Sequence, residues 1–173
     1  MPKSIAEGRE KVTVLTERPE GLTSSGGTID AATLNAGQDA SCNLARNGHR
    51  MSATASDTVS DPAVCDEGNK NVLGASNYEW TWVPFRYFDV ETGLPDSAED
   101  WLFDLVRAKG ATVVAAQRKN GNMHDDDWTE GEEGYLWVGR NDNPQDPTDT
   151  GGYQKATVPF SEIERIPFTV GTD

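Results

Sequence analysis

Apolar and polar residues alternate most clearly in "NYEWTWVPFRYFDV", residues 77–90. On an extended chain, its first three large aromatic side chains share one side: Tyr78, Trp80 and Trp82. A period of two is typical of a β-strand with one buried face. A row of rings can also stack on sugars or bases, but core packing is the favoured interpretation. Pro84 cannot donate a ladder hydrogen bond, so the strand is predicted to break or to lie at a sheet edge there.

Residues 97–109 show helical spacing instead. Apolar side chains recur at three- and four-residue intervals along one stripe: Ala98, Trp101, Leu102, Leu105 and Val106. Ser97, with Asp100 three residues later, resembles a capping box, and Gly110 is predicted to end the helix. This pattern predicts one amphipathic helix that packs on a sheet as part of the scaffold.

Further strands are predicted on both sides of this helix. One is marked by alternating β-branched residues at 11–16, and the others are expected at 111–117, 134–140, 153–160 and 166–171. Residues 30–37 predict one or two helical turns between Asp30 and Gly37, and residues 39–44 weakly predict a strand. Because helices do not follow each strand, the predicted fold class is mainly β: an antiparallel β-sandwich or partly open barrel with one flanking helix at about 97–109.

Three long segments are too polar to contribute to a core. They are predicted loops at about residues 45–76, 121–133 and 141–152. With 173 residues, the chain is expected to form one domain, 1–173. Long structureless segments in a compact domain are usually functional or disordered, or they are arms that become ordered against a neighbour.

The loop at 121–133 reads "GNMHDDDWTEGEE" and is dominated by acidic side chains. An EF-hand calcium loop spaces its ligands at alternating positions between two helices, whereas Asp125, Asp126 and Asp127 are consecutive and their flanks predict strands. His124 has no second histidine nearby in the sequence, and a charge run is usually a solvated surface. We therefore expect an exposed, self-repelling hairpin loop that holds no metal ion. No catalytic residue and no cofactor are expected either, since neither a nucleophile–base set nor a glycine-rich phosphate loop occurs.

The chain has 15 basic and 29 acidic residues, a formal net charge of -14. Such a surface repels phosphate backbones and disfavours a protein that reads nucleic-acid sequence. No apolar run approaches the length of a membrane span, and "MPKSIAEGREKV" lacks a secretory h-region, so synthesis in the cytoplasm is expected. Cys42 and Cys65 lack metal-ligand spacing; a disulfide between them stays open, but two buried thiols are the favoured interpretation.

Three stretches carry a resemblance to a known family: "MPKSIAEGREKVTVL", "AATLNAGQDASCNL" and "SDPAVCD". A lysine-bearing start, an LNAG-D-SC segment and a later second cysteine resemble the N-terminal part of major tail tube proteins from bacteriophages with long, non-contractile tails (siphophages). The order of elements is similar to that family over most of the chain. The likeness is close at residues 34–42 and around Cys65, whereas the acidic stretch departs from the family pattern.

This resemblance implies a structural virion protein with no chemistry of its own. It implies hexameric rings in which the subunits complete a ring-shaped β-barrel, and rings that stack into a hollow tail tube. The implied partners are other copies of the chain and other phage tail proteins, and the implied location is the virion tail after assembly in the host cytoplasm. An extended N-terminal arm and the polar loops would order against neighbouring subunits, while genome DNA would pass through the lumen without specific binding.

Strand alternation also suggests which acidic residue lines the lumen. Burial of the aromatic side of residues 77–83 leaves Glu79 and Thr81 on the opposite face, just as burial of Ala156, Val158 and Phe160 leaves Lys155 and Thr157 outward. Carboxylates on a lumen wall repel DNA phosphates. Glu79 is the best single candidate for a lumen-facing residue.

Two alternatives come from other functional classes. One is a small carbohydrate- or peptide-binding β-sandwich that uses a tryptophan as its platform: Trp80, Trp82, Trp128 or Trp137. The other is a metal-dependent hydrolase built on residues 121–133. The first should be a monomer with a ligand groove, and the second should lose activity to chelators.

Overall fold

A computed structural model describes residues 7–60, 64–65, 71–147 and 151–172. The strands are β1 (Glu10–Leu15), β2 (Gly27–Asp30), β3 (Gln38–Asp39), β4 (Arg50–Thr54), β5 (Thr58–Ser60), β6 (Asn71–Leu73), β7 (Asn77–Trp82), β8 (Thr112–Lys119), β9 (Glu133–Asn141) and β10 (Val158–Gly171). The helices are α1 (Ala31–Asn35), the 3-10 turn η1 (Ser41–Asn43) and α2 (Trp101–Val106). The described part of the chain is therefore mainly β with few helices, as predicted.

Most strands belong to one sheet with the order β3-β1-β8-β9-β10-β7-β4, and β2 pairs with β10. All neighbours in that order are antiparallel, and β2 alone runs parallel to its partner. The strand β10 has 14 residues and pairs in turn with β7, β9 and β2. A bulge between Ser161 and Glu164, with Glu162 at φ 52, bends β10 from one layer into the other. The prediction of two separate closing strands, at 153–160 and 166–171, was thus wrong, because residues 158–160 and 166–171 belong to one bent strand and residues 153–157 precede it.

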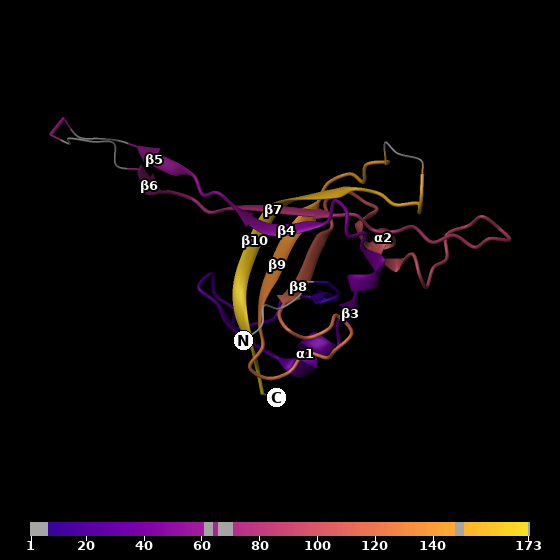
Figure 1. The fold of residues 1–173 in the computed structure, drawn as a ribbon, viewed down its shortest axis with the longest axis horizontal. Helices are drawn as coiled ribbons and strands as arrows, with labels where there is room; N and C mark the ends of the chain where they lie inside the picture. The colour runs from indigo at the N-terminus through magenta and orange to yellow at the C-terminus, as the bar shows by residue number, and fades with distance from the viewer. Residues whose placement is uncertain (1–6, 61–63, 66–70, 148–150, 173) are drawn as a thin grey trace.

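The sheet buries side chains on both of its faces. In Figure 1, β8, β9 and β10 run side by side, while β4 and β7 cross over them at one end. Alternate residues of β8 belong to different clusters: Val113 and Ala115 pack toward β4 and β7, and Val114 and Ala116 pack toward β2 and α1. A strand buried on both faces reads as a continuous apolar run, which explains "VVAA" in this segment.

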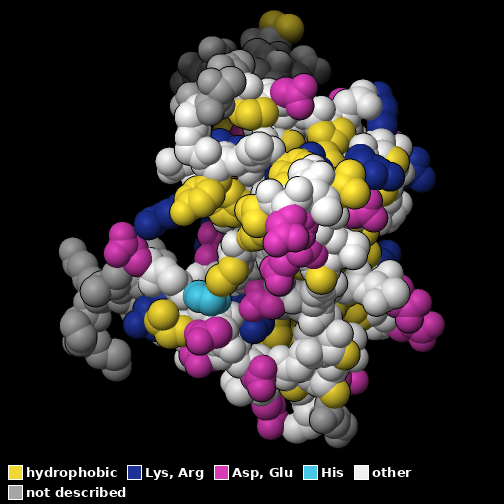
Figure 2. All heavy atoms as spheres, turned by 90° about the vertical axis from the view of Figure 1, so that its right-hand side faces the viewer, with side chains coloured by type: hydrophobic (Ala, Val, Ile, Leu, Met, Phe, Trp, Pro, Cys, Tyr) yellow, Lys and Arg dark blue, Asp and Glu magenta, His cyan; other side chains and the backbone are white. Residues whose placement is uncertain are grey.

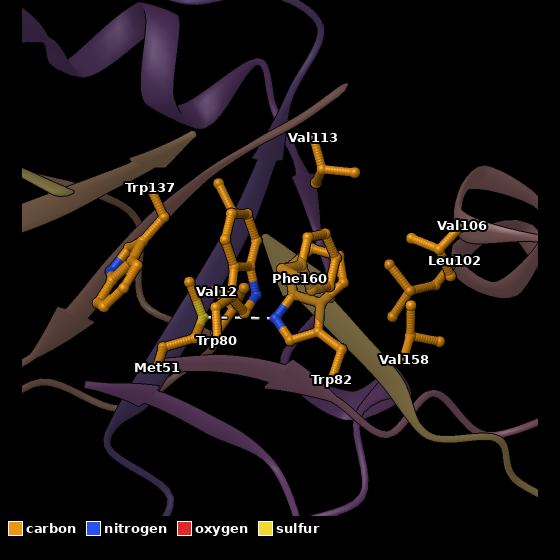
Figure 3. Close-up of a cluster of buried hydrophobic side chains, with 12 residues drawn as sticks. Val12, Met51, Trp80, Trp82, Leu102, Val106, Val113, Trp137, Val158 and Phe160 are labelled. Carbon is orange, nitrogen blue, oxygen red and sulfur yellow. Dashed lines mark hydrogen bonds between the residues drawn. The ribbon is translucent and has the colours of Figure 1, made fainter. Parts of the chain in front are cut away.

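The first cluster is built around aromatic side chains (Figure 3). The Trp80 ring stacks on Phe160 with centroids 4.0 Å apart, and Trp82 meets Phe160 edge-on. Gly139 makes this packing possible, since a Cβ there would lie 2.9 Å from the Trp80 ring. The predicted burial of Trp80 and Trp82 is confirmed, and Tyr78 is partly buried. All four tryptophans offered as a ligand platform are at most 1% exposed, so that alternative loses its binding surface.

The predicted helix at 97–109 is shorter in the structure, where α2 has six residues. Two side chains fix its limits. The carboxylate of Asp100 accepts hydrogen bonds from Arg86 and from the Tyr87 N–H, which holds it at the N-cap position. The Asn141 side chain donates to the Val106 and Ala108 carbonyls and so satisfies the C-terminal end. The buried face also differs from the predicted stripe, because Phe103 is buried and Leu105 is exposed.

Other local predictions fare differently. The strands predicted at 11–16, 111–117 and 134–140 are confirmed within one or two residues as β1, β8 and β9. The helical turn after Asp30 is confirmed as α1, but residues 39–44 form the end of β3 and the turn η1 rather than a strand. The predicted loop at 45–76 contains three strands, because β4 pairs with β7 and β5 pairs with β6.

Candidate assembly surfaces and the acidic loop

The acidic loop lies on the surface, with Asp125, Asp126 and Asp127 exposed as predicted. It is nevertheless no freely hydrated hairpin, because Trp128 is buried in the second cluster. The Trp128 indole N–H donates to Thr13 Oγ1 over 3.0 Å. The Asn35 side chain, from α1, accepts from the Trp128 N–H and donates to its carbonyl. The expectation of a self-repelling, solvated loop was therefore wrong for its inner side.

Arg118, at the end of β8, explains why the loop can fold over the sheet. Its side chain is fully buried and donates to three loop carbonyls, those of Met123, Asp126 and Asp127, at 2.8 to 3.0 Å. In addition to these carbonyls, the guanidinium contacts the Glu132 carboxylate, which lies 2.7 Å from Arg118 Nη1. The guanidinium thus gathers the inward-facing carbonyls while the three aspartate side chains point to solvent.

Glu132 is the counterpart of this buried cation. Burial by itself raises the pKa of the Glu132 carboxyl, but hydrogen bonds from the Thr129 N–H, Asn120 and Arg118, with the charge of Arg118, lower it overall. The carboxylate therefore stays ionised and paired. Among the described residues, no group of three or more His, Cys, Asp or Glu side chains is placed to hold a metal ion.

A second polar network joins the two ends of the strand order. Among the described strands no ladder connects β4 to β1 or β3, so backbone pairing does not close the sheet into a barrel. Instead His49, just before β4, lies 3.2 Å from the Glu10 carboxylate on β1. Gln117 donates to the same carboxylate and accepts from the Trp137 indole. Burial raises the pKa of Glu10, yet hydrogen bonds from His49 and Gln117 and the charges of His49 and Lys119 lower it to about 2.

An open groove of about 690 Å³ follows this junction, which we call the β1–β4 seam. Its walls come from the chain before and within β1, from residues 41–52, and from the end of β8. The apolar side chains in it are Val12, Leu44 and Met51. Its charged side chains are Arg9, Arg46, Arg50, Lys119, Glu7 and Glu10, with His49 and His124 beside them.

A two-stranded hairpin, which we call the β5–β6 arm, extends from the ends of β4 and β7 away from the body (Figure 1). Its apolar side chains Val59, Val72 and Leu73 are 57%, 65% and 77% exposed. In the described part of the chain, the arm strands pair only with each other. An isolated two-stranded hairpin is marginally stable in water, so these side chains lack a core of their own.

A second projection lies on the opposite side of the body in Figure 1. It consists of residues 85–96, and it exposes Val90 and Leu94 at a turn held by the Asp89 carboxylate. At its base, Arg86 stacks on the Phe103 ring at 3.7 Å and pairs with Asp100. The two ends of the long axis therefore both expose apolar side chains, but on unlike structures.

Glu79 is exposed on β7, as strand alternation predicts. Its carboxylate lies 2.6 Å from Arg50 Nε on the neighbouring strand β4. Figure 2 shows acidic side chains scattered over one whole face of the molecule rather than collected in a single patch.

Both cysteines are exposed free thiols, so the prediction of two buried thiols was wrong. Cys42 lies in η1, directly after a residue that lines the seam, and its sulfur is 4.0 Å from His124 Nδ1. Cys65 lies between β5 and β6, beyond the far ends of the arm strands.

Sequence reasoning missed both buried networks. A signal for the first existed, since Arg118 interrupts an apolar strand directly before an acidic run. The second had none, because Glu10, His49 and Gln117 are separated by long stretches of sequence.

Comparisons with known proteins agree with this architecture. A family model described as "Phage tail tube protein" matches residues 1–166. No curated protein and no solved structure is significantly similar to the chain. No helix among the described residues is both long and apolar enough to span a membrane. The match covers nearly the whole chain, and the chain therefore belongs to the phage tail tube protein family.

Proposed function

We propose that this structural tail protein assembles into hexameric rings, and that the rings stack into a hollow tube through which the genome DNA leaves the particle. In this proposal the protein is made in the host cytoplasm, carries out no chemistry and holds no cofactor. It works beside other tail proteins in a siphophage virion.

The β5–β6 arm is the observation that carries the self-assembly step. A lone subunit gains nothing from three exposed apolar side chains on a hairpin with no core beneath it. Burial against another subunit would stabilise them, at about 25 cal/mol per Å² of apolar surface removed from water.

Unlike ends and free edges favour a heterologous contact. The arm lies at one end of the long axis and residues 85–96 lie at the other (Figure 1). A contact between unlike surfaces produces rings when its rotation closes and filaments when it does not. Among the described strands, β4 has a sheet neighbour on one side only, so its outer edge is available for pairing with another subunit.

Electrostatics support an inert conduit. With a net charge of -14, a lumen wall would repel phosphates instead of binding them. Glu79 stays our candidate for a lumen-facing carboxylate, although its partner Arg50 offsets part of its field.

Electron microscopy of the purified protein, alone and with other tail proteins, tests the assembly. The structure provides a matched control. Thr54 and Asn77 face each other across the β4–β7 pair, so a two-residue Asn-Gly turn can replace residues 55–76 as a tight hairpin. We expect tubes from the complete chain and folded monomers from the variant. A complete chain that stays monomeric at high concentration with its tail partners present would refute the proposed function.

A further inference from the structure

The chain contains the dipeptide Asn–Gly twice, at Asn47–Gly48 and at Asn120–Gly121. An asparagine side chain can react with the next backbone nitrogen, and a glycine at that place leaves the nitrogen unhindered because it has no Cβ. The flanking residues are similar, since an arginine precedes the first pair and a lysine precedes the second. Sequence alone therefore does not separate the two sites, but their surroundings in the structure do.

The amide of Asn120 is held at both of its polar atoms. Its Nδ2 donates to Glu132 Oε1 over 2.9 Å, and its Oδ1 accepts a hydrogen bond from the Asn122 N–H at 2.8 Å. Glu132 is fixed in turn by its ion pair with the buried Arg118. Rotation of the Asn120 amide toward Gly121 would break both hydrogen bonds, so the structure protects this site.

Asn47 has no such restraint. Asn47 and Gly48 are exposed in the turn at residues 46–48, directly before β4. The Asn47 side chain and the Gly48 N–H form no hydrogen bond with any described residue. The turn also requires its glycine, because Gly48 has φ 88 and a Cβ there would lie 3.1 Å from Val83 Cγ2. The fold thus places an unrestrained side-chain amide next to an unhindered backbone N–H.

The reaction that this arrangement allows needs no oxidant, reductant or cofactor. The Gly48 nitrogen bonds to Asn47 Cγ, the bond from Cγ to the side-chain nitrogen breaks, and that nitrogen leaves as ammonia with the proton of the Gly48 N–H. Water then opens the cyclic imide: its hydroxyl enters the new carboxyl group and its other proton returns to the Gly48 nitrogen. Opening at Cγ gives aspartate. Opening at the backbone carbonyl carbon of residue 47 gives isoaspartate, whose main chain is one atom longer.

The turn is a short connection with both ends fixed. On one side, the Ala45 N–H donates to the Val83 carbonyl at 2.8 Å. On the other side, His49 lies 3.2 Å from the Glu10 carboxylate on β1. An added main-chain atom between these ends displaces His49 from Glu10, and so weakens the contact that joins β4 to β1.

We propose that Asn47 is a site of spontaneous deamidation in the folded protein, and that its products loosen the junction between β1 and β4. Aspartate adds a negative charge beside the seam, and isoaspartate adds the charge and also lengthens the turn. The inference concerns the single subunit and does not rest on the proposed assembly.

Peptide mass spectrometry of the incubated protein tests the site. The folded protein should gain the mass expected for exchange of –NH2 for –OH at Asn47 at least about tenfold faster than at Asn120, because only the second amide must give up two hydrogen bonds. In concentrated urea, where both pairs are unfolded, the two rates should be similar. Equal rates in the folded protein, or an unchanged ratio in urea, would overturn the inference.

Asn47→Gln is the matched variant for the consequence, because a glutamine closes its larger ring far more slowly and the Asn47 side chain has no described partner to lose. Aged protein should unfold at a lower urea concentration than fresh protein, whereas aged Asn47→Gln should match its own fresh sample. Fresh Asn47→Asp carries the charge without the longer turn and should unfold between fresh and aged protein. Protein that is modified at Asn47 but unfolds like the fresh sample would overturn the loosened junction. None of these measurements depends on tube formation, so either failure leaves the proposed function intact.

Discussion

The body and the arm of this protein differ in how they treat apolar side chains. In the body, four tryptophans are at most 1% exposed, and every strand of the main sheet except the two-residue β3 contributes side chains to a core. In the arm, two short strands pair only with each other among the described residues and expose their apolar side chains. The burial of the body stabilises a single chain, whereas the exposed side chains of the arm would be buried only in the assembly that we propose.

The same contrast divides the ion pairs. Arg118 and Glu132 are 0% and 8% exposed, and the guanidinium also holds three carbonyls of the acidic loop. Arg50 and Glu79 form a pair of similar length with about half of each side chain exposed. Burial makes the first pair structural, while solvent makes the second weak and leaves its charges available to other molecules.

The largest expected effect is in the body. Arg118→Met leaves the buried Glu132 carboxylate without its counter-charge and removes a donor from three carbonyls, so we expect the free energy of unfolding to fall by about 3 to 5 kcal/mol. Urea unfolding of the monomer followed by tryptophan fluorescence measures this change. The matched variant Arg50→Met should cost less than about 1 kcal/mol, since that pair is exposed.

A double variant tests whether the unpaired charge of Glu132 causes this loss of stability. Arg118→Met/Glu132→Gln removes the uncompensated charge and should recover part of the loss. Equal losses in Arg118→Met and Arg50→Met would mean that burial does not separate the two pairs.

The second effect concerns the junction of the seam and depends on pH. Glu10 has a pKa of about 2 in the folded protein, below the 4.5 of an unperturbed glutamate. Because the unfolded state then binds the proton more readily, the stabilisation is complete above pH 4.5 and is lost as the pH falls toward 2. Glu10→Gln should therefore cost on the order of 1 to 3 kcal/mol at pH 7, after allowance for partial exposure.

Unfolding of the two proteins across this range measures the linkage. The difference in the free energy of unfolding between the unsubstituted protein and Glu10→Gln should shrink as the pH falls from 4.5 to 2. A difference that stays constant would show that the carboxylate has the same pKa in both states. Glu164→Gln is a suitable control, since that carboxylate pairs with the exposed Arg18 on the protein surface.

How far the sequence predicts this protein follows the same division. Alternation predicted the buried side of β7, and short apolar runs predicted the strands β8 and β9, because both patterns depend on local packing. Helical spacing located α2 but not its ends, because Asp100 and the distant Asn141 fix them. The sequence patterns also missed β4, because its polar residues are held by pairing with β7. They missed the buried Arg118 as well, because its partners lie on a loop whose composition predicts a hydrated surface.

We expect substitutions in the arm to affect folding less than assembly. Val72→Ser/Leu73→Ser removes apolar side chains that are already in water, so we expect the monomer to change by less than about 0.5 kcal/mol. Sedimentation should show that assembly is nevertheless lost. Leu136→Ser, in the second core, is the opposite case and should unfold the monomer. A loss of monomer stability equal to that of a core variant would show that the arm packs on its own body.

The smallest expected effect concerns the exposed pair at Glu79. If Glu79 lines the lumen, Glu79→Lys places a positive charge beside Arg50 and beside the passing DNA. The tubes should still form, because an exposed ion pair contributes less than about 1 kcal/mol. DNA release should slow, most clearly at low salt, where the screening length grows from about 10 Å at 0.1 M to about 30 Å at 0.01 M. Release from virions at several salt concentrations, followed with a DNA-binding dye, measures this.

Glu79→Gln separates loss of charge from its reversal and should have an intermediate effect. Glu130→Lys makes the same reversal on the exposed acidic loop; equal slowing by both would point to net charge instead of a lumen position. Particles with Glu79→Lys that release DNA normally at every salt concentration would remove Glu79 from the lumen wall.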